Sequence, residues 1–285
     1  MSTQYDAIGA KYDLFCDLPI QQMNHAAMMK HLGPIVHSKR ILELACGTGF
    51  YTSKMLHMGA SHVTAVDISS AMVSAAQAKI PVEMKDNITF CTADCAQSSM
   101  WNEVQLRGQE GTFDMVVAAW LLNYAETREM RRMLENIYLA LKPGGILIAL
   151  TVNAPIIDSF QPNDQLNPRE AHLGSVYDVI GTVEGGYKIL LSSVGLGEND
   201  IKFEFYFLRE EVYRQAAAEA GMGQLEWNVV LLGEEHLQMQ GPKFWQLYLD
   251  RPRSAICVSR KPKVELREQS SINISSGSEL LTKTE

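Results

Sequence analysis

The sequence predicts an α/β fold, a doubly wound arrangement on a mostly parallel sheet. Two observations lead to this prediction. Short apolar runs rich in β-branched residues recur along the first half of the chain, as expected of strands covered on both faces. Helical patterns lie between these runs at the spacing of βαβ units. The five runs cover residues 40–46, 62–68, 87–94, 113–120 and 144–152.

Helical patterns separate the predicted strands. The segments 50–58, 69–80 and 126–142 each end at glycine or proline, residues that terminate helices. The third segment carries an apolar stripe at helical spacing, formed by Met130, Met133, Leu134, Ile137 and Leu141. We expect this stripe to pack against the sheet.

The flanking regions differ from this alternating core, which we expect to span residues 40–260. Residues 1–39 contain helical patterns and are predicted to form an N-terminal helical lid. Residues 154–208 combine prolines, glycines and two strand candidates, and we interpret them as an inserted cap over the carboxyl edge of the sheet. Residues 261–285 are polar and serine-rich, a composition typical of a disordered tail.

Composition narrows the classes of partner. The 285 residues carry a net charge of -8, which argues against nucleic acid. No apolar run reaches the ~18 residues of a membrane span, and the N-terminus lacks a signal-peptide pattern. The five cysteines are widely spread, and neither they nor the seven histidines have metal-ligand spacing. We expect a cytoplasmic monomer or homodimer that binds a small molecule, with no metal, nucleic acid or membrane.

The loop after the first predicted strand indicates a ligand site. In "LELACGTGF", Gly47 and Gly49 would let the backbone turn tightly beside a ligand. Open α/β sheets bind ligands at this edge. A dinucleotide fingerprint would need a third glycine where Thr52 stands, and the spacing of a Walker A loop is also missing. The loop therefore gives little support to a pyrophosphate or triphosphate ligand.

Carboxylates accompany three consecutive strands. Asp67 could accept hydrogen bonds from both hydroxyls of a ribose, or instead cap the next helix. Asp94 could accept from an adenine amine beside the backbone of Cys95, or be a turn residue. Glu43, two residues before Ala45, adds a carboxylate near an ammonium group. An amino acid, a ribose and an adenine without phosphates describe S-adenosylmethionine.

These motifs resemble those of class I S-adenosylmethionine-dependent methyltransferases. "LELACGTGF" is similar to the family's first motif, "VTAVDIS" to its ribose motif, "CTADC" to its adenine motif, and "FDMVVAAWLLNYA" and "LKPGGILI" to later ones. More narrowly, "YDAIGAKYD", "LACGTGFYT" and "LLNYA" resemble toxoflavin synthase-like enzymes, small-molecule N-methyltransferases of secondary metabolism. The resemblance implies a seven-stranded sheet with its last strand antiparallel, which fits two closing strands at 223–232 and 254–260.

The resemblance also implies which residues form the site. Lid tyrosines would fold over the sulfonium, although they could simply pack the first helix. Residues after the fourth strand would face the methyl group, although Asn123 could instead cap the helix near Glu126. The catalytic candidates are Tyr12, Trp120, Asn123 and Tyr124. The cofactor-binding candidates are Tyr5, Tyr12, Glu43, Ala45, Gly47, Gly49, Asp67, Ile68, Met72, Asp94, Cys95 and Ala119.

The reaction itself is less constrained. A nitrogen that is neutral at pH 7 needs no strong base, and the sequence shows no acid and base pair at diagnostic spacing, so N-methylation of a secondary metabolite is favoured over O- or S-methylation. His25, His172 and His236 are the candidate proton acceptors, or plain surface residues. The cap (154–208) and the segment 234–250, with Phe244, Trp245 and Tyr248, could together wall an aromatic substrate pocket, or these aromatic residues could be ordinary packing.

Two other functions remain open at this point. The chain could bind S-adenosylmethionine without transferring its methyl group, as a partner subunit or a pericyclase-like catalyst does. It could also be a nicotinamide-dependent oxidoreductase, which Thr52 in the glycine loop disfavours. An S-adenosylmethionine-dependent methyltransferase acting on a small molecule is the prediction.

Overall fold

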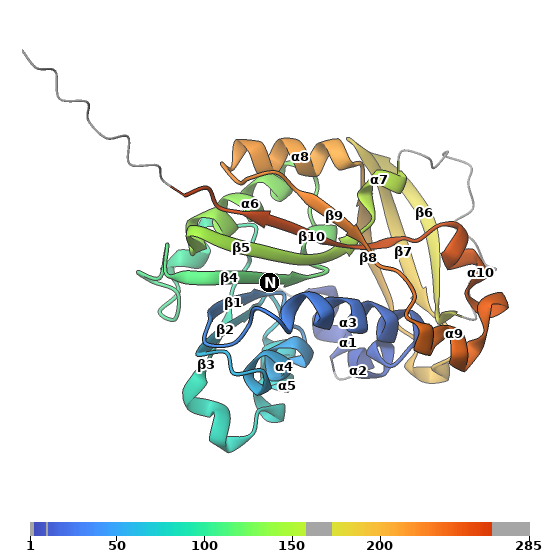
Figure 1. Ribbon diagram of the computed structural model, residues 1–285, viewed down its shortest axis with the longest axis horizontal. Helices are drawn as coiled ribbons and strands as arrows, with labels where there is room; N and C mark the ends of the chain where they lie inside the picture. The colour runs from blue at the N-terminus through green and yellow to red at the C-terminus, as the bar shows by residue number, and fades with distance from the viewer. Residues whose placement is uncertain (1–2, 10, 158–172, 264–285) are drawn as a thin grey trace, which may run out of the picture.

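The computed structural model describes residues 3–9, 11–157 and 173–263 (Figure 1). Its centre is a seven-stranded sheet with the order β3-β2-β1-β4-β5-β10-β9. The strands are β1 (Arg40–Leu44), β2 (His62–Asp67), β3 (Ile88–Thr92), β4 (Phe113–Ala119), β5 (Leu141–Val152), β9 (Glu226–Val229) and β10 (Ser254–Arg260). The first five are parallel, whereas β10 is antiparallel to both its neighbours. The predicted mostly parallel sheet with an antiparallel last strand is confirmed.

Helices cover both faces of this sheet. They are α1 (Gln4–Ile8), α2 (Lys11–Cys16), α3 (Pro19–Leu32), α4 (Phe50–His57), α5 (Ser70–Lys79), α6 (Thr127–Ala140), α7 (Ala154–Ile157), α8 (Glu210–Glu219), α9 (Glu234–Gln240) and α10 (Pro242–Asp250). Short 3-10 helices are η1 (Val82–Asn87), η2 (Ser98–Asn102), η3 (Leu121–Tyr124) and η5 (Gly197–Asn199). Side chains of α6 and α8 pack on one face, and side chains of α3, α4 and α10 pack on the other.

Alternation along the strands produces these two cores. In β1, Leu42 and Leu44 belong to the core under α6, while Ile41 belongs to the core under α3 and α4. Successive strand side chains point to opposite faces, so a strand that is covered twice must be apolar at most of its positions. This requirement explains why the strands are recognisable as continuous apolar runs.

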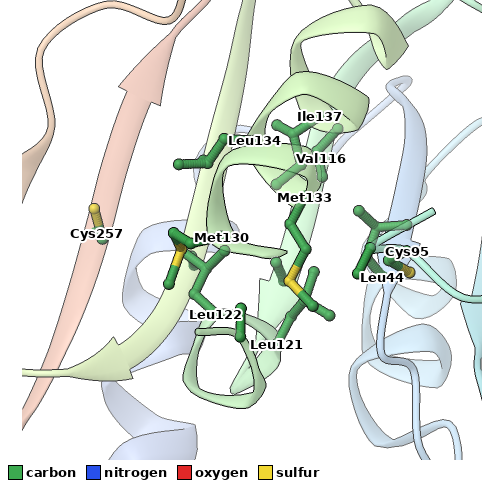
Figure 2. Packing of buried hydrophobic residues seen from close by; sticks show 14 of the residues in the cluster. Leu44, Cys95, Val116, Leu121, Leu122, Met130, Met133, Leu134, Ile137 and Cys257 are labelled. Carbon is green, nitrogen blue, oxygen red and sulfur yellow. The ribbon is translucent and has the colours of Figure 1, made fainter. Parts of the chain in front are cut away.

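Helix α6 confirms the expected methionine packing. Met130, Met133, Leu134 and Ile137 are at most 5% exposed and lie against the sheet (Figure 2). Each such side chain contributes about 1.5–3 kcal/mol on burial. Glu126 and Glu129 form a capping box at the helix start. Leu141, the last residue of the predicted stripe, already belongs to β5.

A second sheet lies between α7 and α8. Its antiparallel strands are β6 (Ser175–Val183), β7 (Gly186–Ser193) and β8 (Lys202–Leu208), in the order β6-β7-β8. Strands β7 and β8 coincide with the two strand candidates, and β6 was not predicted. Residues 158–172 of the proposed cap lie outside the described residues, as do residues 264–285 of the proposed tail. The division into lid, core, cap and tail therefore stays a prediction.

Within the described residues, no helix combines the length and the apolar character needed to cross a bilayer.

Candidate functional site

A cavity of about 490 Å³ lies at the carboxyl edge of the central sheet. Its wall combines the loops after β1, β2, β3 and β4 with side chains from α1, α2 and α3. Most of the predicted site residues line it: Tyr5, Tyr12, Ala45, Gly47, Asp67, Ile68, Met72, Asp94, Cys95, Ala119, Trp120 and Tyr124. Glu43, Gly49 and Asn123 do not.

The glycine loop needs its two glycines for different reasons. Gly47 has φ +53°, and a Cβ there would meet only a Tyr12 ring carbon at 3.9 Å, so this glycine leaves the cavity open. Gly49 has φ +85°, and a Cβ there would lie 3.0 Å from the Cβ of Ala76. Gly49 thus allows α4 to approach α5, which corrects its expected place beside the ligand. Ala45 also has a positive φ, +58°, where glycine is usual in this loop.

Two carboxylates face the cavity. Asp67 accepts hydrogen bonds from the backbone amides of Gly47, at 2.8 Å, and Ser69, at 2.9 Å. Burial raises the pKa of Asp67, and these hydrogen bonds oppose the rise. Asp94 follows β3 and accepts from the Ala96 amide at 2.8 Å through one oxygen, Oδ1. The observed hydrogen bonds leave further lone pairs on both carboxylates.

Glu43 lies behind the loop instead of on the cavity wall. Its side chain is 2% exposed and accepts a hydrogen bond from the Thr52 hydroxyl. Burial raises the pKa of Glu43 to about 8, so the group is mostly a neutral acid at pH 7. Its location and its protonation both correct the expected contact with an ammonium group.

Three tyrosines meet over the cavity. Tyr5 packs edge-on against Tyr12 and Tyr124, with ring centroids 6.0 and 5.5 Å apart, and its hydroxyl donates to the Tyr124 hydroxyl. Phe203 of β8 joins the cluster at 5.9 Å from Tyr5. Burial raises the pKa of each tyrosine above its usual value, so all three stay protonated near neutral pH. The tyrosines therefore do more than pack against the first helix, because they connect the N-terminal helices to the second sheet.

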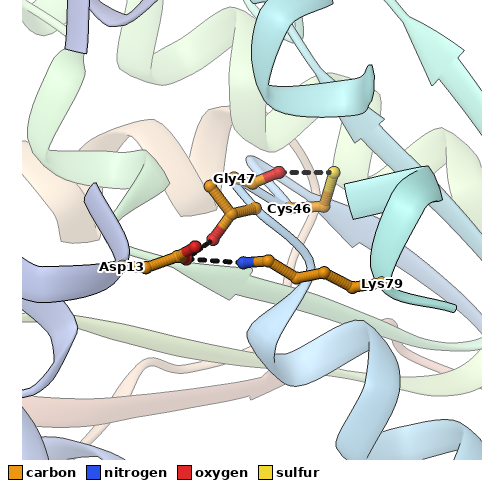
Figure 3. A network of polar contacts seen from close by, with 5 residues as sticks. Asp13, Cys46, Gly47 and Lys79 are labelled. Atoms are coloured by element: carbon orange, nitrogen blue, oxygen red, sulfur yellow. Dashed lines mark hydrogen bonds and ion pairs between the residues drawn. The ribbon is translucent and has the colours of Figure 1, made fainter. Parts of the chain in front are cut away.

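Polar contacts fasten the N-terminal helices over the loop. Asp13 of α2 accepts from the Thr48 hydroxyl at 2.5 Å and pairs with Lys79 at 2.6 Å (Figure 3). Asp6 of α1 accepts from the Ser69 hydroxyl at 2.6 Å. The segment predicted as a lid is thus bonded to the loops that follow β1 and β2.

A second cavity, of about 40 Å³, adjoins the first. Its wall is mostly apolar and comes largely from the second sheet: Tyr177, Leu191, Phe203, Phe205 and Phe207. The Arg253 guanidinium lies 4.9 Å from the centroid of the Tyr177 ring. Four residues line both cavities, and we name them the junction: Tyr12, Gln21, Trp120 and Tyr124.

Trp120 and Asn123 follow β4 at this junction. Trp120 has φ +64°, an uncommon conformation for a bulky residue, and its amide donates to the Leu150 carbonyl at 2.7 Å. Asn123 is 1% exposed, accepts from the Thr151 hydroxyl at 2.9 Å and lines the smaller cavity. It does not cap α6, because Glu126 occupies the N-cap position.

The three histidines proposed as proton acceptors lie in different places. His25 lines the larger cavity, His236 lines neither of the two cavities, and His172 lies outside the described residues. Trp245 and Tyr248 are buried in the core under α10, where the Tyr248 hydroxyl donates to the Val230 carbonyl, so the expected aromatic wall at 234–250 was wrong.

Sequence reasoning missed Gln21 and the phenylalanines of β8. In β8, Phe203, Phe205 and Phe207 alternate with exposed or half-buried residues, a period-two signal that was available in the sequence. Gln21 is 5% exposed, and no comparable signal marks it. In the part of the chain that the structure describes, no cluster of three His, Cys, Asp or Glu side chains could hold a metal ion.

Residues 41–145 match the family model of a methyltransferase domain, and the sheet order is that of the class I fold. Residues 41–145 thus form a methyltransferase domain, and the fold of the chain is that of class I S-adenosylmethionine-dependent methyltransferases. The chain is 29% identical over 168 residues to demethylmenaquinone methyltransferase of Lactococcus lactis, covering 56% of this chain and 59% of that protein. It is 27% identical over 154 residues to malonyl-[acyl-carrier protein] O-methyltransferase of Bacillus cereus, covering 53% and 52%.

The methyltransferase fold extends beyond the matched domain. The chain spans little more than half the length of these two curated relatives. An S-adenosylmethionine-dependent methyltransferase from Mesorhizobium loti, known as a crystal structure, superposes with a TM-score of 0.55 at 19% identity. That superposition covers 86% of this chain and 98% of the other, a likeness of fold.

Proposed function

We propose that this chain transfers the methyl group of S-adenosylmethionine to a nitrogen of a small molecule. One observation carries the proposal: the larger cavity at the glycine loop, which Asp67 and Asp94 line, meets an aromatic-walled cavity at the junction of Tyr12, Gln21, Trp120 and Tyr124. Methyl transfer requires a donor and an acceptor that are held in line at one point. Two cavities that share a wall supply such an arrangement.

The larger cavity fits S-adenosylmethionine in three places. Asp67 would accept from the ribose hydroxyls, and Asp94 with the Cys95 backbone would hold the adenine, with Ile68 and Met72 also in the cavity wall. Bound S-adenosylmethionine supplies an electrophilic methyl group on a sulfonium. The aromatic rings of Tyr12 and Trp120 line the cavity where this cation would lie, which favours it over the neutral product.

The acceptor atom follows from the chemistry of the junction. Among the described residues that line both cavities, none is a carboxylate, a histidine or a lysine. The two tyrosines of the junction stay protonated, because burial raises their pKa values. A hydroxyl nucleophile would need a base at this point, whereas an uncharged amine or ring nitrogen does not. The junction therefore favours N-methylation over O-methylation.

The second cavity indicates the kind of acceptor. Four of its rings, Tyr177, Phe203, Phe205 and Phe207, belong to β6 and β8, and at about 40 Å³ the cavity has room for about three waters. Side chains of the second sheet must therefore move apart to admit a ring. Aromatic walls favour a flat, largely apolar molecule. With the resemblance to toxoflavin synthase-like enzymes, we extend the proposal to an aromatic or heteroaromatic secondary metabolite.

Methyl transfer can be measured directly. The purified chain would be incubated with methyl-labelled S-adenosylmethionine and a panel of amines and nitrogen heteroaromatics, and labelled products would be identified by mass spectrometry. We expect at least one N-methylated product with stoichiometric S-adenosylhomocysteine. Tight cofactor binding without any product across the panel would instead indicate a binding protein. A methyl label on oxygen or sulfur would show that the enzyme methylates that atom and not nitrogen.

A further inference from the structure

Two buried polar side chains of α3 line the larger cavity. Gln21 and His25 are one helical turn apart and only 5% and 7% exposed. The Nε2 atom of His25 is buried and makes no well-formed hydrogen bond within the described ranges, although the Cys16 carbonyl interacts with the ring. The side-chain amide of Gln21 makes no hydrogen bond to any described residue either. Buried polar groups are normally satisfied, so their position in a cavity wall points to a ligand.

The other ring nitrogen of His25 shows what Nε2 offers. The Tyr51 hydroxyl lies 2.7 Å from Nδ1, and no other described residue accepts a hydrogen bond from that hydroxyl. Burial lowers the pKa of His25 to about 4, with the Cys16 carbonyl opposing the shift, so the ring is neutral at pH 7. A neutral imidazole has one N–H and one lone pair. We assign the lone pair to Nδ1, where Tyr51 donates, and the proton to Nε2.

His25 lies at the end of the cavity beside the glycine loop. Its ring stacks on Phe50 with centroids 4.0 Å apart, and Phe50 and Tyr51 begin α4 directly after Gly49. The Lys54 ammonium lies 5.8 Å from the Phe50 ring centroid and adds positive potential here. With the ribose at Asp67 and the adenine on the far side of it, the amino-acid end of the cofactor would reach this position.

We propose that the Nε2–H of His25, together with the Gln21 amide, binds the carboxylate of the amino-acid end of S-adenosylmethionine. This inference rests on the proposed function, because it assumes the cofactor. It gives His25 a binding role as a hydrogen-bond donor and excludes it as the proton acceptor that the sequence had suggested. Tyr51 positions the ring by holding Nδ1.

Two ligands that differ only at this end test the inference. S-Adenosylhomocysteine has the amino-acid end, and 5′-methylthioadenosine keeps the adenosine and the sulfur without it. Isothermal titration would compare both ligands on the wild type, His25→Phe and His25→Gln. We expect His25→Phe to weaken the binding of S-adenosylhomocysteine by about ten- to a hundredfold, because a hydrogen bond to a charged acceptor is lost. The affinity for methylthioadenosine should stay unchanged. His25→Gln, which keeps an N–H donor, should recover part of the loss.

A matched control and a second variant complete the design. His236→Phe replaces another buried histidine, which lines neither cavity, and should change neither ligand. Tyr51→Phe removes the hydrogen bond to Nδ1 of His25 and should weaken the binding of S-adenosylhomocysteine but not of methylthioadenosine. This variant tests the proposed role of His25 if His25→Phe fails to fold. Equal losses for both ligands, or no loss, would overturn this inference while leaving the proposed function standing. A wild type that binds neither ligand would overturn both.

Discussion

The Asp67 carboxylate accepts a hydrogen bond from the Gly47 amide at 2.8 Å, although the two residues are 20 positions apart in the chain. Strands β1 and β2 are parallel neighbours, so their carboxyl ends place the glycine loop beside Asp67. One carboxylate oxygen holds the loop, and the other holds the turn at Ser69. The lone pairs that remain face the cavity.

Replacing this carboxylate tests its contact with the cofactor. Asp67→Asn keeps the shape and one acceptor, and loses the charge and the second acceptor. We expect S-adenosylhomocysteine to bind more weakly by about 1.5–3 kcal/mol, the value of hydrogen bonds to a charged group. Isothermal titration measures this loss. Asp114→Asn is the matched control, because Asp114 lies at the start of β4, where it pairs with Lys142 outside the cavity. Equal affinity of the two variants would remove Asp67 from the site.

The buried Glu43 predicts a pH dependence of stability. Its pKa is about 8 in the folded chain against an ordinary value of 4.5, so the folded state binds this proton more tightly. The stability that the protonated group provides is complete at low pH and is lost as the pH rises toward 8. Relative to Glu43→Gln, the wild-type free energy of unfolding should fall from about pH 5 to about pH 8, by at most about 1.4 kcal/mol per unit.

Urea denaturation of both proteins at several pH values measures this difference. The side-chain amide that Glu43→Gln introduces can keep the contact with Thr52 and carries no titrating proton. A stability difference that stays constant between pH 5 and 8 would show that Glu43 is ionised, or solvated, in the folded chain.

The Gln4 side chain fastens α1 to the edge of β8. Its amide donates to the Glu204 carbonyl and accepts from the Glu204 amide, both at 3.0 Å. Gln4→Ala should loosen the lid, increase hydrogen exchange in α1 and weaken cofactor binding by about 1 kcal/mol, since exposed neutral hydrogen bonds are weak. Exchange mass spectrometry and titration measure the two effects. Gln215→Ala, at an exposed position of α8, should change neither. An unaltered α1 in Gln4→Ala would refute the contact.

The Trp120 ring lies at the junction between the two cavities. Trp120→Phe should leave the affinity for S-adenosylhomocysteine, which has no sulfonium, unchanged and lower turnover at least about tenfold, because a smaller ring positions the acceptor less firmly. Steady-state kinetics with any substrate found in the panel measures this. Trp101→Phe is the control, since Trp101 is buried away from both cavities and bonds to Asn136. If both variants turn over like the wild type, Trp120 does not position the acceptor.

The sequence predicts the central fold well because its strands are covered twice. Burial on both faces leaves continuous apolar runs in β1 and β4, and the carboxyl ends of parallel strands bring Gly47, Asp67 and Asp94 to one edge. Strand β6 escapes prediction because only Ser175 of its nine residues is buried, and Asp178, Ile180 and Thr182 are exposed. Local composition therefore identifies buried strands more readily than edge strands.

The site was harder to predict wherever side-chain direction depends on distant residues. Glu43 points to Thr52 and away from the ligand, and no local pattern indicates this. Trp245 and Tyr248 have the same aromatic character as Phe203 and Phe205, yet the first pair fills a core and the second pair walls a cavity. Only the packing of the second sheet against the junction distinguishes them.

A crystal structure of the chain with S-adenosylhomocysteine tests the central claim most directly. We expect the ribose hydroxyls to bind the Asp67 carboxylate. We expect the sulfur to lie at the junction, between Trp120 and Tyr124, facing the aromatic cavity. A ligand bound with its ribose away from Asp67, or with its sulfur turned from the junction, would contradict it.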